Sequence, residues 1–347
     1  MLYLLVLVAH RGLAQRASPE LFGAIDGTVA DMSLAGLPNV GVGILDEPWR
    51  SIRTSSGVGY RVDSLPPGPH PLRTVVVLLG TGMPRPDPNA SGPATAVLVG
   101  PRVFLFDAGP GVMRRMAAAR LPINGVEALF ITHLHSDHTL GLPDLIFTSW
   151  VMGRQRALEA YGPHGLKQMT EHILAAWQQD EDVRVNGLEH EPAAGYSVNV
   201  HEIQPGVVYD SGGVRITAFP VLHGNWKEAY GYRIDTPTRS VVISGDTRPS
   251  DALVAAARNV DVLVHEVYSA ARLAPEHRPG GDDWPRYMRQ FHTSDQELGK
   301  IAAEDKPKLL VLTHIIRMGA TDEDLLRGIR AGGFTGRVVV GHDLGRY

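Results

Sequence analysis

The chain has 347 residues, of which 44% are hydrophobic and 20% are charged, and its formal net charge at pH 7 is −4. This composition is ordinary for a globular protein with a full core, and the length is sufficient for two folding units. The small negative charge argues against strong binding to nucleic acids or membranes through bulk charge, and the lack of cysteine excludes disulfides, thiolate metal ligands and a cysteine nucleophile.

Residues 1–19 are a candidate leader. The run MLYLLVLVA (1–9) is apolar, too short to span a bilayer, and similar to the core of a signal peptide, and Gly-Leu-Ala at 12–14 offers a cleavage pattern of small residues. No basic residue precedes the run and His10 ends it, so a mis-assigned start or a buried first strand is the alternative. A cleaved leader predicts a periplasmic or secreted protein, and an uncleaved one a cytoplasmic protein.

Residues 20–72 form a segment of their own. Short runs rich in β-forming residues, such as GTVAD (27–31) and GLPNVGVGILD (36–46), alternate with Gly, Pro and Ser, which predicts a small antiparallel β-sandwich. The order of these runs, followed by YRVDSLPPGPHPLR (60–73), resembles the carboxypeptidase regulatory-like (transthyretin-like) domain. That module often precedes catalytic domains in exported bacterial proteins, and nothing in this segment predicts catalysis.

Residues 73–347 are predicted to form a second unit of the α/β class. Apolar runs predict strands at 74–82, 94–100, 103–109, 126–133, 214–221, 229–235, 239–245, 260–266, 308–314 and 337–341. Helical periodicity predicts helices at 139–153, 165–180, 249–258, 293–305 and 322–331. Predicted hairpins come first and strand–helix alternation second, which favours two sheets packed face to face with helices outside.

The stretch ITHLHSDH (131–138) carries four metal-capable side chains directly after a predicted strand. His133 and His135 share one side of extended backbone, whereas Asp137 and His138 follow the bend. One turn could therefore serve two cations close enough to share a bridging hydroxide. Imidazole and carboxylate ligands favour two Zn²⁺ per chain, with Mn²⁺ or Fe²⁺ as alternatives.

Three further predicted strands end on a metal-capable side chain. FPVLHG ends at His223, VVISGDT at Asp246 and LLVLTH at His314. We expect these three to lie on one sheet edge and to complete a two-metal site. His190 and His201 lie near His223 in the sequence, but His223 is preferred because it ends an apolar run and precedes a glycine.

Together these residues resemble the metallo-β-lactamase superfamily over about residues 72–347. The resemblance implies the four-layer αβ/βα sandwich of that family. It assigns the first metal to His133, His135 and His223, the second metal to Asp137, His138 and His314, and a bridging role to Asp246. It also implies a zinc-dependent hydrolase that attacks with a metal-bridging hydroxide, with Asp137 orienting this nucleophile and accepting its proton.

Further stretches are similar to the ribonuclease Z branch, the tRNA 3′-end endonucleases and related phosphodiesterases. They are LGTGMPRP (79–86), GLPDL (141–145), YGPHGL (161–166), HEVY (265–268) and FHTSDQELGKIA (291–302). The resemblance implies that Glu266 and His292 form a pair that protonates the leaving oxygen. The alternative is a surface glutamate and a helix-capping His-Thr-Ser segment. Asp107 is expected either to support the ligand loop or only to form the FDAG turn.

The predicted function is therefore a phosphodiesterase or ribonuclease Z-like enzyme acting on small-molecule or nucleic-acid phosphodiesters. The tRNA enzymes carry a long clamp arm before the GDT motif (245–247), and its absence here argues against tRNA. A β-lactam or lactone hydrolase on the same site is the alternative, and a binding module with a relic site is a third. No membrane partner is predicted, and relatives of this branch suggest a homo-oligomer, dimer or higher, by analogy.

Overall fold

The computed structural model describes residues 43–45, 52–54, 73–275 and 283–347. The chain divides into two units, Met1–Pro69 and His70–Tyr347. In the first unit the described residues form one antiparallel pair, β1 (Gly43–Leu45) with β2 (Ile52–Thr54). The candidate leader and the rest of the predicted β-sandwich lie outside the described residues, so both remain predictions, as does the boundary at residue 72.

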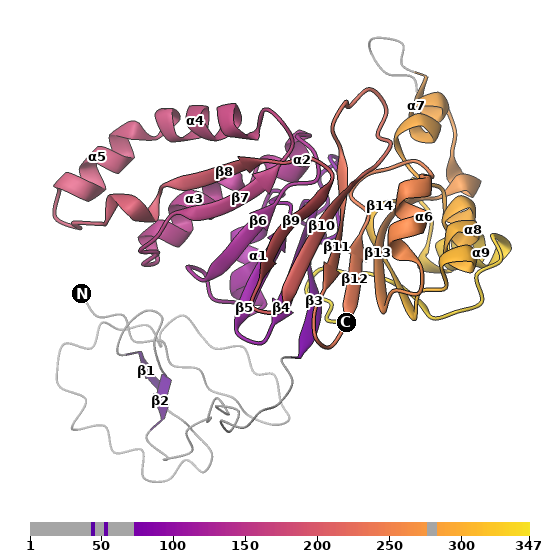
Figure 1. Ribbon diagram of the computed structural model, residues 1–347, viewed down its shortest axis with the longest axis horizontal. Coiled ribbons are helices and arrows are strands. Elements are labelled where there is room, and N and C mark those ends of the chain that lie inside the picture. Colours follow the sequence, from indigo (N-terminus) through magenta and orange to yellow (C-terminus); the bar gives the residue numbers. More distant parts are fainter. Residues whose placement is uncertain (1–42, 46–51, 55–72, 276–282) are drawn as a thin grey trace, which may run out of the picture. The chain divides into compact units, whose positions relative to one another are not determined.

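The second unit contains two mixed β-sheets (Figure 1). One sheet has the order β3-β4-β5-β6-β7-β8, with β3 (Thr74–Gly80), β4 (Ala94–Val99), β5 (Arg102–Phe106), β6 (Val126–Phe130), β7 (Leu158–Gly162) and β8 (Val198–Glu202). The other has the order β15-β14-β13-β12-β11-β10-β9, with β9 (Gly206–Ser211), β10 (Val214–Pro220), β11 (Tyr230–Asp235), β12 (Ser240–Ile243), β13 (Val262–Tyr268), β14 (Leu309–Ile316) and β15 (Val338–Val340). In each sheet the earlier strands pair antiparallel and the later strands parallel.

Helices follow or separate many of the strands, and several of them cover the outer faces of the two sheets. They are α1 (Val112–Ala118), α2 (Ser136–Thr139), α3 (Leu142–Val151), α4 (Leu166–Ala176), α5 (Gln178–Asn186), α6 (Asp251–Ala257), α7 (Trp284–Phe291), α8 (Asp295–Asp305) and α9 (Asp322–Ala331), with short 3₁₀ turns at Ala193–Gly195 and Ala270–Arg272. One apolar core joins α1 and α3 to the six-stranded sheet, and another joins α6, α8 and α9 to the seven-stranded sheet. No helix in the described part of the chain is both long enough and apolar enough to cross a bilayer.

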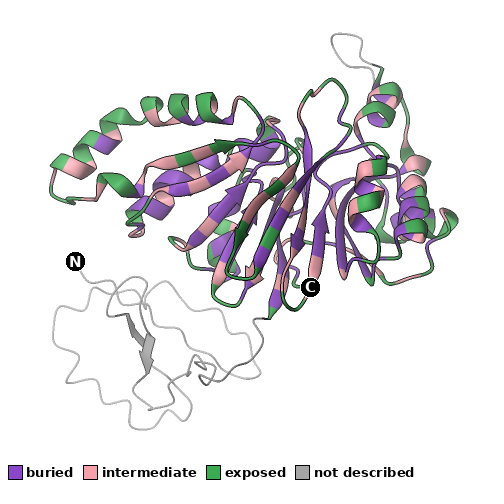
Figure 2. Cartoon of the chain, in the orientation of Figure 1, coloured by how far each residue is buried: buried purple, intermediate pink, exposed green. Residues whose placement is uncertain are grey.

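A third core lies between the two sheets and explains the continuous apolar runs. In β3, Val76 and Leu78 belong to this inner core, whereas Val77 and Leu79 belong to the core under the helices. Side chains alternate along a strand, so a strand buried on both faces is apolar at every position. Figure 2 shows the strands of both sheets largely buried and the helices exposed on their outer sides. The predicted αβ/βα sandwich is confirmed.

The sequence prediction was incomplete between residues 154 and 213. Strands β7, β8 and β9 lie there and were not predicted, because β8 and β9 carry exposed polar residues at several positions and give no apolar run. The helix predicted at 165–180 is two helices, α4 and α5, that meet at Trp177. The segment from residue 224 to 245 holds the single hairpin β11–β12, as the sequence predicted.

Candidate metal centre

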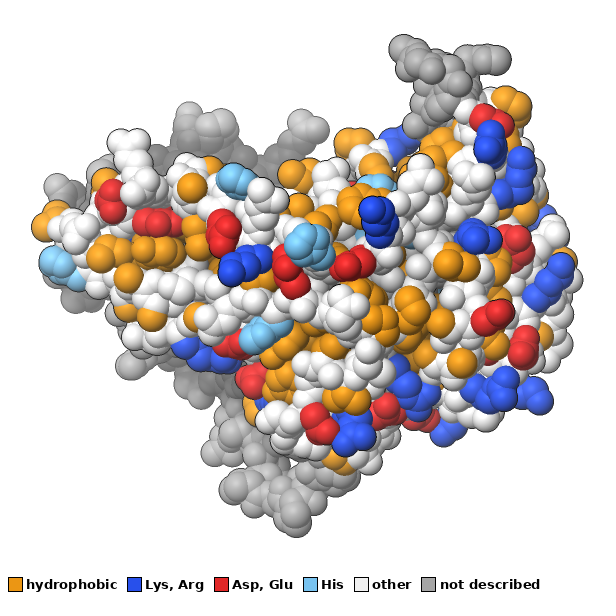
Figure 3. All heavy atoms as spheres, turned by 45° about the horizontal axis from the view of Figure 1, so that its top comes forward, with side chains coloured by type: hydrophobic (Ala, Val, Ile, Leu, Met, Phe, Trp, Pro, Cys, Tyr) orange, Lys and Arg blue, Asp and Glu red, His pale blue; other side chains and the backbone are white. Residues whose placement is uncertain are grey.

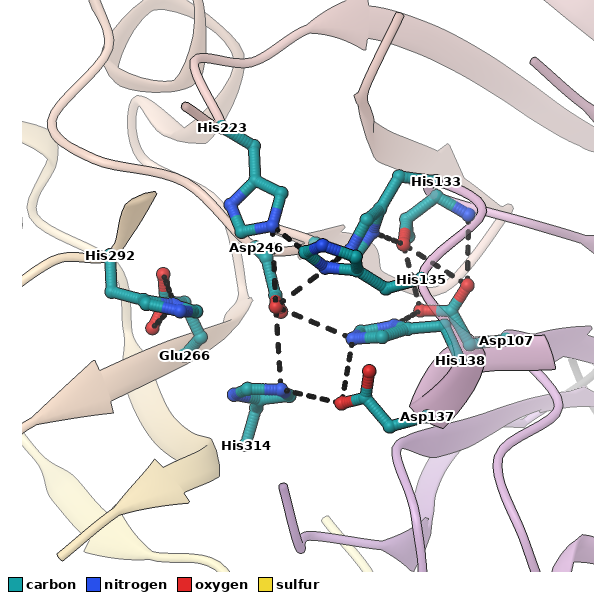
Figure 4. A network of polar contacts seen from close by, with 12 residues as sticks. Asp107, His133, His135, Asp137, His138, His223, Asp246, Glu266, His292 and His314 are labelled. Carbon is teal, nitrogen blue, oxygen red and sulfur yellow. Dashed lines mark hydrogen bonds and ion pairs between the residues drawn. The ribbon is translucent and has the colours of Figure 1, made fainter. Parts of the chain in front are cut away.

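The predicted ligands lie where strands of both sheets end (Figure 4). Strands β10, β12 and β14 run parallel to one another within the seven-stranded sheet, so their carboxyl ends share an edge. His223 and Asp246 follow the first two of these strands, and His314 lies within β14. The turn after β6 of the other sheet supplies His133 and the residues after it.

A β-bulge positions His314. Glu266 of β13 pairs with Thr313, but the next residue, Val267, pairs with Ile315. His314 is therefore the extra residue of β14, and it adopts a left-handed backbone conformation with φ of 42°. This conformation is uncommon for a non-glycine residue, and bulges often direct a side chain toward an active site. The imidazole of His314 consequently points to the other ligands (Figure 4).

His133, His135, His223 and Asp246 form the first group of ligand atoms, all within 4.8 Å of one another. Nδ1 of His135 lies 2.9 Å from Nε2 of His133 and 3.1 Å from Nε2 of His223. All but His135 are buried. The group therefore brings together the three histidines that the family resemblance assigns to the first metal, and it also contains Asp246.

The second group consists of Asp137, His138 and His314, and all three are buried. Nε2 of His314 lies 3.2 Å from Oδ2 of Asp137, and Nε2 of His138 lies 3.6 Å from the same oxygen. Oδ2 of Asp246 lies 3.3 Å from Nε2 of His314 and 3.4 Å from Nε2 of His138. The same oxygen is 3.9 Å from Nε2 of both His133 and His223, so Asp246 stands between the two groups.

These residues fit metal ions by an independent observation. Oδ1 of Asp246 and Nε2 of His138 are buried, and neither has a hydrogen-bond partner among the described residues. A buried polar atom without a partner is costly, and a cation would satisfy both atoms. Nitrogen and carboxylate ligands in this number suit zinc.

The two groups differ in their protonation. Burial lowers the pKa of His133 and His135, and it lowers the pKa of His223 to about 3. These imidazoles are neutral at pH 7 and have a lone pair available for a cation. Burial also acts to lower the pKa of His314, but the charge of Asp246 and the hydrogen bond to Asp137 outweigh it and raise the value to about 9.

The carboxylate of Asp107 supports the ligand loop from behind. Its Oδ1 accepts a hydrogen bond from the backbone N–H of Thr132 at 2.8 Å, and its Oδ2 lies 2.8 Å from Nδ1 of His138. Asp107 itself has a φ of 59°, a left-handed conformation at the point where the chain leaves β5. Its contacts with Thr132 and His138 favour the supporting role over a role in the turn alone. The outer nitrogen of His223 is held in a similar way, because Nδ1 donates to the carbonyl of Phe291 at 2.8 Å.

Glu266 and His292 form the predicted pair beside the cluster. Nδ1 of His292 lies 3.1 and 3.2 Å from the two carboxylate oxygens of Glu266. Glu266 is buried rather than on the surface, and burial raises its pKa. His292 also lies with Asp246 and His314 in a third group of ligand-capable atoms within 4.8 Å. Ser294, two residues after His292, caps α8. The His-Thr-Ser segment therefore caps a helix, as the alternative predicted, and His292 still pairs with Glu266.

Sequence reasoning missed two groups that touch the ligands. The hydroxyl of Thr132 contacts His133, and the carbonyl of Phe291 contacts His223. Thr132 directly precedes His133 in the sequence and so could have been singled out, whereas a backbone carbonyl leaves no signal in the residue types. Trp226, which the sequence places close to His223, lies with its indole Nε1 2.9 Å from Nε2 of His135.

Comparison with known families identifies one domain model. Residues 102–315 match the model described as "Beta-lactamase superfamily domain". A protein named ribonuclease Z from Mycobacterium sp. (strain KMS) is 37% identical over 278 residues, which cover 78% of this chain and 94% of the relative. A second, from Mycobacterium bovis (strain BCG / Pasteur 1173P2), is 35% identical over 277 residues, which cover 78% of this chain and 96% of the relative.

Solved structures share the fold at lower sequence identity. The metallo-β-lactamase fold protein YhfI from Bacillus subtilis has a TM-score of 0.62 and 20% identity, covering 79% of this chain and 99% of its own. The short form of human tRNase Z has a TM-score of 0.60 and 22% identity, covering 79% and 98%. A diphosphatase from the PhnP family has a TM-score of 0.58 and 20% identity, covering 79% and 97%.

Proposed function

The chain belongs to the metallo-β-lactamase superfamily, and on that premise we propose that this metal-dependent hydrolase is a dinuclear zinc phosphodiesterase of the ribonuclease Z type. The observation that carries the proposal is the pairing of two groups of buried ligands with a His–Glu pair at their side. The relatives named ribonuclease Z, at 37% and 35% identity, support phosphodiesters as the substrate class.

Seven side chains would hold the two ions. We assign His133, His135 and His223 to the first, Asp137, His138 and His314 to the second, and Asp246 to both. When bound, such ions lower the pKa of water to about 7 and draw charge from a phosphoryl oxygen. These assignments rest on the distances within the two groups.

The protein side chains supply the proton transfers. Burial acts to raise the pKa of Asp137, but the hydrogen bond from His314 and the charge of His138 lower it overall, so its carboxylate is ionised and accepts the proton of the attacking water. The imidazole of His292 donates through Nδ1 to Glu266. As an imidazolium, His292 would pass its Nε2 proton to the oxygen released from phosphorus and become neutral, with Nδ1–H still on Glu266. General acid and base groups of this kind typically contribute about 10²–10⁴-fold to a rate.

The described surface does not favour extensive contact with nucleic acid. On the face drawn in Figure 3, basic and acidic side chains are interspersed, and β11 and β12 form a short hairpin rather than an arm. We therefore propose small phosphodiesters or short nucleic-acid ends as substrates in preference to tRNA held by a clamp. We also propose a homo-oligomer, on the analogy of the family alone.

The test combines a metal assay with three hydrolysis assays on the same sample. We expect two zinc ions per chain by plasma mass spectrometry, and faster cleavage of bis-(p-nitrophenyl) phosphate or an RNA 3′-trailer than of nitrocefin. His292→Ala should lower phosphodiester cleavage by about 10²–10⁴-fold with zinc content unchanged, because its imidazole is not among the seven ligands.

The other outcomes point elsewhere. Faster cleavage of nitrocefin or of a lactone would assign the site to β-lactam or lactone hydrolysis. Less than one metal per chain together with no turnover of any substrate would contradict the hydrolase. Loss of zinc in His292→Ala would mean that His292 is a ligand rather than an acid.

A further inference from the structure

We infer that Thr132 is a positioning residue for the metal centre. Its hydroxyl links the carboxylate of Asp107 to His133 in a chain of hydrogen bonds, called the relay below, which fixes the nitrogen of that imidazole that faces the metal. The inference concerns metal binding and thus rests on the proposed dinuclear site. It does not depend on which substrate is cleaved.

The hydroxyl of Thr132 lies between two polar partners in the buried interior. Oγ1 is 3.1 and 3.0 Å from the two oxygens of Asp107, and 3.0 Å from Nδ1 of His133. Thr132 is 1% exposed and Asp107 is 5% exposed. Polar groups buried this deeply need hydrogen-bond partners within the protein.

The direction of these hydrogen bonds follows from which of the three groups can donate a proton. An ionised carboxylate only accepts, whereas a hydroxyl has one proton to donate and lone pairs to accept with. The proton of Thr132 is therefore directed to Asp107, and toward His133 the hydroxyl accepts. Nδ1 of His133 consequently carries the imidazole proton, and Nε2 keeps its lone pair on the side of His135 and Asp246.

One carboxylate thereby orients a ligand in each group. Asp107 accepts directly from Nδ1 of His138 at 2.8 Å, and it reaches Nδ1 of His133 through the threonine hydroxyl. Hydrogen bonds of this kind to the outer nitrogen of a ligand fix its tautomer and its ring orientation, and their loss typically costs about 10–100-fold in metal affinity. The relay therefore couples the two metal positions through a single buried acid.

The backbone and the methyl group keep the hydroxyl in place. The carbonyl of Thr132 accepts from the N–H of Tyr230 in β11 at 2.9 Å, which ties the residue to the opposite sheet. A Cβ added to Gly245 would lie 3.2 Å from Cγ2 of Thr132, so the methyl group packs against the turn that carries Asp246. Threonine thus combines a fixed rotamer with a hydroxyl at the required position.

Three variants separate the hydroxyl from the methyl group. Thr132→Val keeps the shape and removes the hydroxyl, and Thr132→Ser keeps the hydroxyl and removes the methyl group. Thr170→Val is the matched control, because Thr170 is also buried and its hydroxyl donates to the carbonyl of Leu166 within α4. Zinc affinity is measured in the full-length protein by competition with a chromophoric chelator, and thermal stability is measured in excess chelator.

We expect Thr132→Val to bind zinc about 10–100-fold more weakly, while Thr132→Ser and Thr170→Val stay within about threefold of the native protein. Native affinity in Thr132→Val, or equal losses in the valine and serine variants, would overturn the relay. Zinc binding by the native protein separates either result from a failure of the proposed function.

A second measurement needs no substitution at Thr132. In native protein with ¹⁵N-labelled histidine, loaded with zinc, we expect a slowly exchanging proton on Nδ1 of His133. An unprotonated Nδ1 would overturn the relay even if Thr132→Val failed to fold. If the native protein bound no zinc, the proposed function would fail, and the same spectrum of the metal-free protein would still decide the tautomer.

Discussion

The histidines of the centre have two kinds of surroundings although they lie within a few ångströms of one another. For His133 and His223 burial is the largest effect, and it lowers their pKa values although the charge of Asp246 acts to raise them. His138 is equally buried, but Asp246 and Asp107 outweigh the burial and raise its pKa well above the usual value. The first group is thus ready for a cation, whereas the second must release protons to the solvent when it binds one.

Asp305 offers a pH test at the residue scale. It ends α8, is 0% exposed, and neither of its carboxylate oxygens has a hydrogen-bond partner within the described residues. Burial, with a smaller effect of Glu304, raises its pKa to about 7. The folded state then binds a proton that the unfolded state has already lost, so stability falls as pH rises from about 4 to 7.

We expect Asp305→Asn to remove this loss. The free energy of unfolding of the variant is compared with that of the native protein at each pH. This difference should be up to about 4 kcal/mol more favourable to the variant at pH 8 than near pH 4. Urea unfolding at both pH values provides the measurement, and the comparison between them cancels any constant effect of the amide. A difference that does not change with pH would contradict the buried, raised carboxyl group.

At the scale of elements, the strands that end on a ligand were predictable because their apolar runs and final residues are adjacent in the sequence. Residues 214–221, 239–245 and 308–314 were predicted as strands, and β10, β12 and β14 lie there. The bulge that turns His314 inward was not predictable, since it arises from the pairing of β13 with β14 and not from local residue types. The edge strands β8 and β9 were missed for a different reason, because strands that are half exposed need no continuous apolar run.

The capping box at the N-terminus of α8 allows a test of whether it positions His292, with the capping box of α9 as the control. Ser294 and Glu297 form a capping box two residues after His292, and Thr321 and Asp324 form one at the start of α9. Ser294→Ala and Thr321→Ala should each lower stability by about 1 kcal/mol, as measured by thermal unfolding. Only Ser294→Ala should also lower phosphodiester hydrolysis severalfold, because its cap holds the backbone next to the proposed acid. Equal rates in both variants would show that the cap does not position His292.

At the scale of the whole molecule, the fold class was predictable because hairpins and strand–helix alternation repeat in both halves. The role of the N-terminal segment was not, because its short runs between glycines and prolines depend on turn chemistry rather than on a long periodic pattern. Every proposed ligand, both sheets and all three large cores lie in His70–Tyr347.

That distribution predicts an autonomous unit. A chain of residues 70–347 should fold and bind the same number of zinc ions as the full chain, since no proposed ligand is removed. Circular dichroism, thermal unfolding and the metal assay on both chains provide the comparison. An insoluble or metal-free product would mean that the N-terminal segment completes the catalytic unit, and would contradict the proposed boundary.

The proposed ligands come from both sheets: His133 follows β6 of one, and His223 and Asp246 follow strands of the other. The apolar core stabilises the two sheets by burial, which has no preferred direction. Coordination would add bonds of defined direction between the sheets at the edge where the ligands meet. The ions would then join the two sheets as well as serve the chemistry, and we expect the metal-free protein to unfold faster than the metal-bound protein although its apolar core is unchanged.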